Sequence, residues 1–288
     1  YNKGLEMDPN NSNVYMGLAE HYSSIVNYEK ALFYVNKGIA IKKDDPLLYA
    51  IQGDAFYFQD DFHYKEALNA YLNSFKLDGK DAVVANYAGL CYEELGDVKN
   101  AKRFYQKAID LGSEDSDCYN DLAYLIHGKE PLVAIKLTEK AIEIDPQNHY
   151  AYGMKGDILY DIGLYEKAIE SYTKAIELDT LNRNYYVDRA YANRALGNLK
   201  ASIEDLSKSI FYGANLEEAY FMRAIIYMTE DKFDLAKADF DAFIYLNNEI
   251  ANVFMLRAAC YYKLGNVASA CSDAQIAAAL GDADAKKY

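Results

Sequence analysis

The sequence predicts an all-α protein, an α-solenoid of stacked antiparallel helix pairs. One pattern recurs at a fixed period: GNLKASIEDLSKSIFYG begins at residue 197, DKFDLAKADFDAFIYLN at 231 and GNVASACSDAQIAAALG at 265, so each copy starts 34 residues after the last. Small residues recur at matched places within the copies, and apolar residues recur at helical spacing. A period of this length indicates a solenoid rather than a globular domain with one central core.

The first helix of each unit has an aromatic residue near its start in seven of the eight units, and a small residue four positions later. The opening position is held by Tyr15, Tyr49, Ala85, Tyr119, Tyr152, Tyr186, Tyr220 and Phe254. Four residues later stand Ala19, Gly53, Gly89, Ala123, Gly156, Ala190, Ala224 and Ala258. Small side chains at this place allow two helix backbones to approach closely.

A short turn separates the first helix of a unit from the second. Gly96, Gly163, Gly197 and Gly265 lie in these turns, where a helix end needs a left-handed residue. In the second helix Ala168, Tyr172, Ala175 and Ile176 share one helical face. Each unit is therefore expected to be a helical hairpin, with a helix A and a helix B that each bury one stripe.

This pattern resembles the tetratricopeptide repeat. The resemblance is carried by Tyr152, Gly156 and Leu159 in helix A, by Ala168-x3-Tyr172 and Ala175 in helix B, and by Pro146, which closes the preceding unit. Departures are the absence of Trp and a closing Pro in only two places, Pro9 and Pro146. The resemblance implies a right-handed superhelix whose inner surface is lined by the A helices and binds protein segments.

We expect one array over residues 1–288. The first eleven residues, 1–11, are expected to end a preceding repeat, and residues 285–288 to begin a cap helix. The eight full repeats are expected at 12–45, 46–81, 82–115, 116–148, 149–182, 183–216, 217–250 and 251–284.

Composition narrows the range of partners. Lys and Arg number 30 against 44 Asp and Glu, a net charge of −14, and such a field disfavours nucleic acid and anionic membrane surfaces. No apolar run is long enough to span a bilayer, so membrane insertion is not expected. The four cysteines, Cys91, Cys118, Cys260 and Cys271, have no metal-ligand spacing and favour free thiols in a reducing, cytoplasmic location, although a bridge between the last two stays open.

Units 6 to 8 share a pair of opposite charges that the earlier units lack. Arg189, Arg223 and Arg257 stand just before the small residue of helix A, and Asp205, Asp239 and Asp273 follow sixteen residues later in helix B. We expect an ion pair within each hairpin that holds the angle of its two helices. The other interpretation is that each Arg is kept for a ligand phosphate or carboxylate.

The sequence offers no catalytic constellation. The four His residues show no metal-binding spacing, and there is no phosphate-binding loop and no nucleophile elbow. We therefore expect a non-enzymatic protein with no cofactor and no metal.

The inner positions implied by the resemblance are rich in carboxylates and tyrosines. Acid beside Tyr favours an extended basic or amide-rich peptide, through charge-assisted hydrogen bonds and cation–π contacts. Further on, Phe221 and Met222 offer an apolar patch suited to an aliphatic anchor, or simply bury the end of the array. The candidate peptide-binding residues are Asp54, Tyr57, Asn86, Asn120, Asp121, Tyr124, Tyr150, Asp157, Tyr160, Asp188, Tyr191, Phe221 and Met222.

Three functions remain open at this point. The first is a scaffold that binds a protein or peptide on the inner surface. The second is the substrate-recruiting array of a larger enzyme whose catalytic domain lies outside this chain, and the third is a spacer gripped on its outer face. Repeats of this family that clamp a chaperone's C-terminal carboxylate carry Lys, Asn and Arg at set positions, and Asp188, Glu218 and Met222 stand there instead, so chaperone C-termini are poor candidates.

Overall fold

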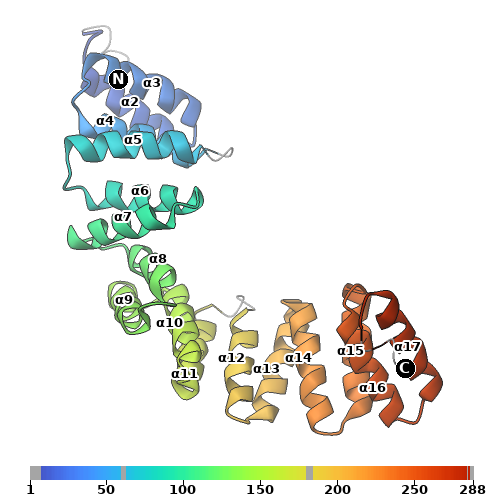
Figure 1. Cartoon of the computed structure of the whole chain (residues 1–288). Coiled ribbons are helices and arrows are strands. Elements are labelled where there is room, and N and C mark those ends of the chain that lie inside the picture. The colour runs from blue at the N-terminus through green and yellow to red at the C-terminus, as the bar shows by residue number, and fades with distance from the viewer. Residues whose placement is uncertain (1–7, 60–62, 180–183, 284, 286–288) are drawn as a thin grey trace. The chain divides into compact units, whose positions relative to one another are not determined.

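The computed structural model describes residues 8–59, 63–179, 184–283 and 285. Within these residues the secondary structure is α-helical: sixteen α-helices are formed, and no β-strand is assigned to any described residue (Figure 1). The helices group into two compact units, residues 1–146 and 147–288, which are described separately here. Residues 1–7 and 286–288, which hold most of the expected end of a preceding repeat and start of a cap helix, lie outside the described residues.

The first unit contains four helical hairpins. In each, two consecutive helices pack side by side: α2 with α3, α4 with α5, α6 with α7, and α8 with α9 (Figure 1). Their bounds are α2 Ser12–Ser24, α3 Tyr28–Ile41, α4 Pro46–Tyr57, α5 Tyr64–Leu77, α6 Ala82–Glu94, α7 Val98–Asp110, α8 Ser116–Ile126 and α9 Pro131–Ile144.

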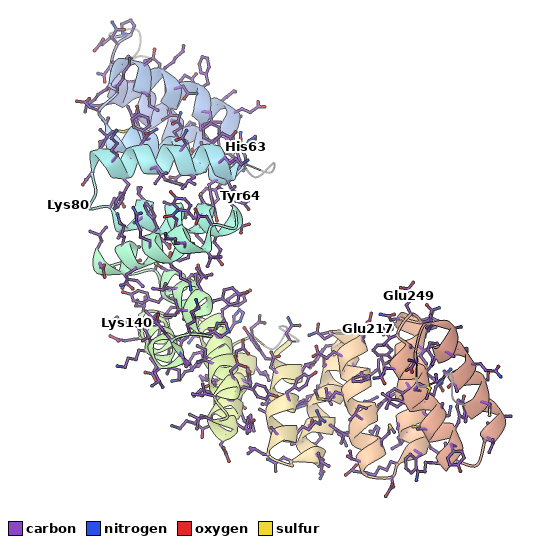
Figure 2. The ribbon with its side chains drawn as sticks, viewed as in Figure 1. His63, Tyr64, Lys80, Lys140, Glu217 and Glu249 are labelled. Carbon is purple, nitrogen blue, oxygen red and sulfur yellow. The ribbon has the colours of Figure 1, made fainter. Side chains whose placement is uncertain are left out.

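The second unit repeats this arrangement. Its helices are α10 His149–Asp161, α11 Tyr165–Leu178, α12 Asn184–Ala195, α13 Leu199–Tyr212, α14 Leu216–Thr229, α15 Phe233–Leu246, α16 Ala251–Lys263 and α17 Val267–Ala279. The B helices α11, α13 and α15 also pack on the A helix of the next hairpin, so the hairpins of this unit stack in chain order. Between α15 and α16, Asn247 donates a hydrogen bond to Glu217 at 3.1 Å and accepts one from the backbone N–H of Glu249; Figure 2 labels both Glu residues.

Local chemistry explains where the helices begin and end. The Asp45 side chain accepts from the backbone N–H of Leu47, and Pro46 occupies the first turn of α4, where it loses no hydrogen bond. Pro131 occupies the same place in the first turn of α9. The four turn glycines adopt left-handed φ values of 76° to 80°, which confirms that part of the analysis.

Close packing of helix A on helix B depends on the small residue of helix A. Gly156 lies under the ring of Tyr172, and a Cβ built there would come within 2.5 Å of a ring carbon. In the same way, Gly53 lies under the ring of Tyr71 and Gly89 lies under the ring of Tyr105. In the hairpin of α12 and α13, by contrast, the small residue of helix A is Ala190 and the matching residue of helix B is Leu206. Both are fully buried. Glycine is thus required where a tyrosine ring crosses the helix backbone.

The three Arg–Asp pairs of the second unit form inside their hairpins. Arg223 donates two hydrogen bonds to Asp239, from Nη2 at 2.7 Å and from Nε at 2.8 Å. Arg189 binds Asp205, and Arg257 binds Asp273, through the same two atoms. All three arginines are mostly buried, and the aspartates are buried.

Each of these arginines also makes a contact that the sequence analysis does not predict. Its third nitrogen reaches back to helix B of the preceding hairpin: Arg189 to Thr173, Arg223 to Ser207 and Arg257 to Asp241, each at 2.7 or 2.8 Å. The guanidinium therefore joins two hairpins as well as the two helices of one hairpin.

Candidate peptide-binding surfaces

In the first unit the predicted residues on α4 are held by aromatic neighbours. Asp54 accepts a hydrogen bond from the hydroxyl of Tyr71 at 2.8 Å, and the pKa of Asp54 is raised, chiefly by burial. The ring of Tyr57 lies 5.3 Å from that of Tyr87 and 5.8 Å from that of Tyr64. Tyr57 is half-buried, so one edge of this cluster stays open to a ligand.

Asn86 and Asn120 occupy matching places on α6 and α8. Asn86 is only 4% exposed and donates from Nδ2 to Asp115 at 2.7 Å. The side-chain oxygens of both asparagines are buried and accept no hydrogen bond from the described residues. A buried acceptor without a donor is costly, and a peptide N–H could satisfy it only after a local rearrangement.

Asp121 lies in an acidic cluster with Glu93, Asp117 and Asp115. Burial, followed by repulsion from these three carboxylates, raises the pKa of Asp121 to about 7. The hydroxyl of Tyr105 donates to Glu93 at 2.7 Å and fixes that carboxylate. Tyr124 is more than half exposed, stacks on His127 and leaves its ring accessible.

In the second unit four of the predicted residues line one cavity of about 280 Å³. Asp157 and Tyr160 come from α10, and Asp188 and Tyr191 from α12. Asp161 and Tyr172 complete the wall, so three carboxyl groups and three tyrosine rings line the cavity. We call this the acidic tyrosine pocket.

Hydrogen bonds orient the walls of the acidic tyrosine pocket. The hydroxyl of Tyr172 donates to Asp157 at 2.8 Å, and that of Tyr191 donates to Glu218 of α14 at 2.7 Å. The pKa of Tyr191 is raised, first by burial and then by Glu218, so its ring stays neutral over the physiological range.

The environment of the acidic tyrosine pocket raises the pKa of Asp188. Burial raises its pKa to about 7, and repulsion from Asp157 and Glu218 adds to the effect. A cation placed beside it would relieve both the desolvation and the repulsion. The pocket is therefore electrostatically suited to a positive group.

The remaining candidates behave differently. Tyr150 is 59% exposed and packs on His149 with 4.0 Å between ring centroids, but it does not line the acidic tyrosine pocket. Phe221 is half-buried against Phe240 and Phe243. Met222 corrects the sequence analysis: it is 3% exposed and packs with Val187, Leu206 and Ile226, so it cannot reach a ligand. The helical spacing places it one position off the open face.

Tyr172 is expected on the buried face of helix B, and Tyr71 and Tyr105 hold the same place in their hairpins, but the hydrogen bonds of these three hydroxyls are not predicted from the sequence. All three are almost fully buried, yet each donates a hydrogen bond to a carboxylate of helix A: Asp54, Glu93 or Asp157. The available signal is the coincidence of Gly in helix A, Tyr in helix B and an acid further along helix A of the same repeat.

Comparison with known proteins identifies the repeat. The tetratricopeptide repeat family model matches residues 87–113, 149–180 and 217–250. The TPR repeat-containing protein MJ1428 of Methanocaldococcus jannaschii is 27% identical over 190 residues, which cover 60% of this chain and 32% of that protein. BBSome complex member BBS4 of Bos taurus is 29% identical over 113 residues, 37% of this chain and 21% of that protein. The chain thus spans less than a third of the length of either relative.

Solved structures share the fold. The C-terminal part of a TPR repeat-containing protein from Cytophaga hutchinsonii aligns with a TM-score of 0.66 and 22% identity, over 83% of this chain and 97% of that one. YrrB, described as a TPR protein with an unusual peptide-binding site, aligns with a TM-score of 0.57 and 22% identity, over 64% of this chain and 95% of that one. At this identity the likeness concerns the fold alone.

Proposed function

We propose that this chain, which contains tetratricopeptide repeats, acts as a non-enzymatic scaffold that holds an extended peptide segment of a partner protein. A Lys or Arg side chain of that peptide enters the acidic tyrosine pocket, and amide groups of the peptide meet polar side chains of the A helices. The single observation that carries this proposal is the pocket itself, with three carboxyl groups and three tyrosine rings around one cavity.

The size of the pocket favours one side chain over a whole small molecule. Its volume of about 280 Å³ lies just below the range of roughly 300–1,000 Å³ that is usual for small-molecule sites. A Lys or Arg stem would pack on the tyrosine rings, and the charged head would meet the carboxylates. The net charge of −14 adds long-range attraction for a basic partner.

The chemistry of the pocket supports binding rather than catalysis. The tyrosine hydroxyls next to the carboxylates have raised pKa values, which makes them hydrogen-bond donors rather than bases. Among the described helices, none has both the length and the apolar character needed to cross a membrane.

The test uses a short labelled peptide of Ser, Asn and Gly with a central Lys, and the same peptide with norleucine in its place. Fluorescence polarisation should show that the wild-type chain binds the Lys peptide more tightly than the norleucine peptide, and that added salt weakens this preference. Asp188→Asn removes a half-buried charge from the pocket and should reduce affinity for the Lys peptide about tenfold.

A matched control separates the pocket from the overall charge. Glu170→Gln removes one exposed carboxylate of α11, outside the pocket, and should leave the affinity nearly unchanged. Equal binding of the two peptides, or equal loss in both variants, would contradict the pocket as the site.

A further inference from the structure

The acidic tyrosine pocket offers a cation more ring surface than a bare ammonium group can cover. The rings of Tyr160, Tyr172 and Tyr191 share one cavity with three carboxyl groups. The cavity measures about 280 Å³, whereas a water molecule, which is close in size to an ammonium group, takes roughly 30 Å³ in the liquid. The head group of an unmodified lysine therefore leaves much of the space between the rings unfilled.

The hydroxyl groups of two of these tyrosines are already used inside the chain. Tyr172 donates to Asp157 at 2.8 Å, and Tyr191 donates to Glu218 at 2.7 Å. What these two residues still offer a ligand is the aromatic ring itself. The face of such a ring carries negative electrostatic potential and attracts cations.

The hydrogen-bonding capacity of the carboxyl groups is also partly used. Asp157 accepts from Tyr172, and Asp161 interacts with another group of the chain. Burial raises the pKa of Asp188 to about 7, so this group is only partly ionised at neutral pH. An unmodified lysine ammonium has three N–H donors and is strongly hydrated. In this pocket it exchanges water for an incomplete set of acceptors, which costs free energy.

Methylation of the lysine nitrogen changes this balance. It removes N–H donors while the positive charge is kept. The methyl groups make the head group larger and less dependent on water, and cages of aromatic side chains bind such cations through their ring faces. A dimethylammonium group keeps one N–H, which a single carboxylate can accept.

From the rings and carboxyl groups that line this cavity, we infer that the acidic tyrosine pocket binds dimethyl-lysine in preference to unmodified lysine. The methyl groups pack against the tyrosine rings, and the remaining N–H donates to Asp188. This inference rests on the proposed function, because it specifies which form of lysine the pocket takes from the partner's peptide.

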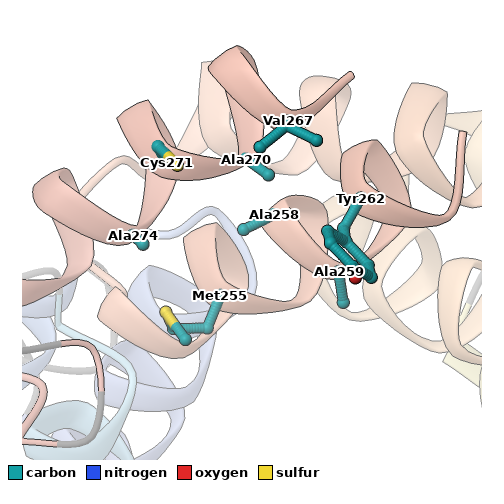
Figure 3. A pocket seen from close by; sticks show the side chains of 8 residues that line it. All are labelled: Met255, Ala258, Ala259, Tyr262, Val267, Ala270, Cys271 and Ala274. Atoms are coloured by element: carbon teal, nitrogen blue, oxygen red, sulfur yellow. The ribbon is translucent and has the colours of Figure 1, made fainter. Parts of the chain in front are cut away.

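A second cavity in the same unit lacks this combination of groups (Figure 3). It lies between α16 and α17 and has a volume of about 530 Å³. Its lining includes the ring of Tyr262, with Met255 and Val267, but no carboxylate. A methylated cation would find one tyrosine ring there and no opposite charge in the wall, so Tyr262 is a suitable place for a control substitution.

The test uses three labelled peptides of Ser, Asn and Gly that differ only at the central residue. This residue is lysine, dimethyl-lysine, or an uncharged analogue with an isopropyl group in place of the dimethylammonium. Fluorescence polarisation should show the dimethyl-lysine peptide binding the wild-type chain about tenfold more tightly than either of the others. Both charged peptides feel the same repulsion from Arg194, which acts on the hydroxyls of Tyr160 and Tyr191, so their comparison isolates the methyl groups.

Substitutions test whether the rings carry the preference. Tyr191→Leu removes one ring and should reduce the preference for dimethyl-lysine to about twofold or less. Tyr191→Phe keeps the ring without the hydrogen bond to Glu218 and should restore the preference. Tyr262→Leu, the same change in the cavity between α16 and α17, should leave it at the wild-type level. If thermal scans show that Tyr191→Leu does not fold, Tyr160→Leu takes its place, because Tyr160 is only half-buried.

Several results would overturn the inference. These are equal or tighter binding of the lysine peptide, equal binding of the uncharged analogue, or a preference that survives the loss of the ring. Free choline should compete about a hundredfold less well than the unlabelled dimethyl-lysine peptide, because it has no N–H for Asp188 and no peptide contacts. Equal competition by choline would assign the pocket to a small quaternary ammonium ligand instead.

Failure of this inference and failure of the proposed function give different results. If the lysine peptide binds no better than the norleucine peptide, the pocket is not a site for a cation and both are wrong. If lysine is preferred to norleucine but dimethyl-lysine is not preferred to lysine, the proposed function stands and only the preference for the methylated form is wrong.

Discussion

Burial decides what individual carboxyl groups do in this protein. Asp188 and Asp121 both have a pKa raised to about 7, with desolvation as the largest cause and neighbouring carboxylates as the second. Exposed acids of the same helices, such as Asp117, have no such burial. The sequence shows that these places are acidic, but the depth at which each carboxyl lies depends on the helix packing.

The raised pKa of Asp188 gives ligand binding a definite pH dependence. A bound cation favours the ionised carboxyl, whereas below pH 7 the free protein holds it largely protonated. Affinity for the Lys peptide should therefore rise with pH up to about 7 and then level off, with a slope of at most about tenfold per pH unit. Fluorescence polarisation from pH 5.5 to 8 measures this dependence, where the pH values are chosen around the titration of Asp188. An unchanged slope in Asp188→Asn would show that another group is responsible.

The same carboxyl should also make folding stability depend on pH, but in the opposite direction to ligand affinity: stability should fall as pH rises. The folded pKa of Asp188 lies above its usual value of 3.8, so folding favours the protonated form, and this contribution is lost as pH rises through about 7. Asp188→Asn should raise the melting temperature more at pH 8 than at pH 5. Thermal scans of both proteins at the two pH values test this, and a gain that is larger at pH 5 would contradict it.

The Arg223–Asp239 pair gives a residue-scale prediction for stability. Arg223→Ala leaves the buried Asp239 without its partner and also breaks the bond to Ser207, so it should cost about 3 kcal/mol. Replacing both residues, as Arg223→Met with Asp239→Leu, should cost less than the single change. Denaturant unfolding measures both free energies. Binding of the Lys peptide should be unaffected, and a selective loss of that binding would favour the ligand-binding interpretation of the arginine.

At the scale of the element, glycine and tyrosine act as a unit across a hairpin. Gly53, Gly89 and Gly156 each lie under a helix B tyrosine, and each ring carries its hydroxyl over the backbone to a helix A carboxylate. The hairpins that place Ala at this site have Val35, Thr138, Leu206, Phe240 or Ala274 opposite, and none of these donates such a bond. Packing and ligand surface are therefore linked by the size of one side chain.

This pairing predicts coupling between the two positions. Gly156→Ala places a methyl group against the ring of Tyr172 and should lower stability by roughly 1–3 kcal/mol, despite the better helix propensity of Ala. Adding Tyr172→Leu recreates the Ala190–Leu206 arrangement. The double variant should be less destabilised than the sum of the single variants, by more than the roughly 0.5 kcal/mol allowed for independent sites. Additive free energies in denaturant unfolding would show that the two residues do not act together.

Much of each element could be predicted from the sequence. The helix periodicity and the turn glycines appear in the structure as expected, because local propensity and burial act in the same direction there. What the pattern cannot provide is the direction of a side chain at the edge of a buried stripe. The pattern leaves open whether Met222 faces a ligand or is buried, and in the structure it packs against Val187. Tyr172 is buried as the pattern predicts, but the pattern does not show that its hydroxyl reaches Asp157.

At the scale of the molecule, each unit is built from hairpins that touch mainly their immediate neighbours. Within each unit, the contacts beyond a hairpin are made chiefly by the B helix with the next A helix. The predicted peptide surface depends on one face recurring from hairpin to hairpin, and repetition is readable from the sequence. The sequence predicts four residues of the acidic tyrosine pocket, but not that they line one cavity, because their convergence depends on how two adjacent hairpins pack.

Nearest-neighbour packing predicts that damage stays local. Gly89→Ala crowds Tyr105 between α6 and α7 in the first unit, and Arg223→Ala opens the contact of α14 with α13 and α15 in the second. Hydrogen exchange read by mass spectrometry should show faster exchange in the altered hairpin and its neighbours, and wild-type protection in the other unit. The two variants serve as controls for each other, because each should leave the region affected by the other unchanged. Uniformly faster exchange along the whole chain would mean that it unfolds as one cooperative body, and would contradict this prediction.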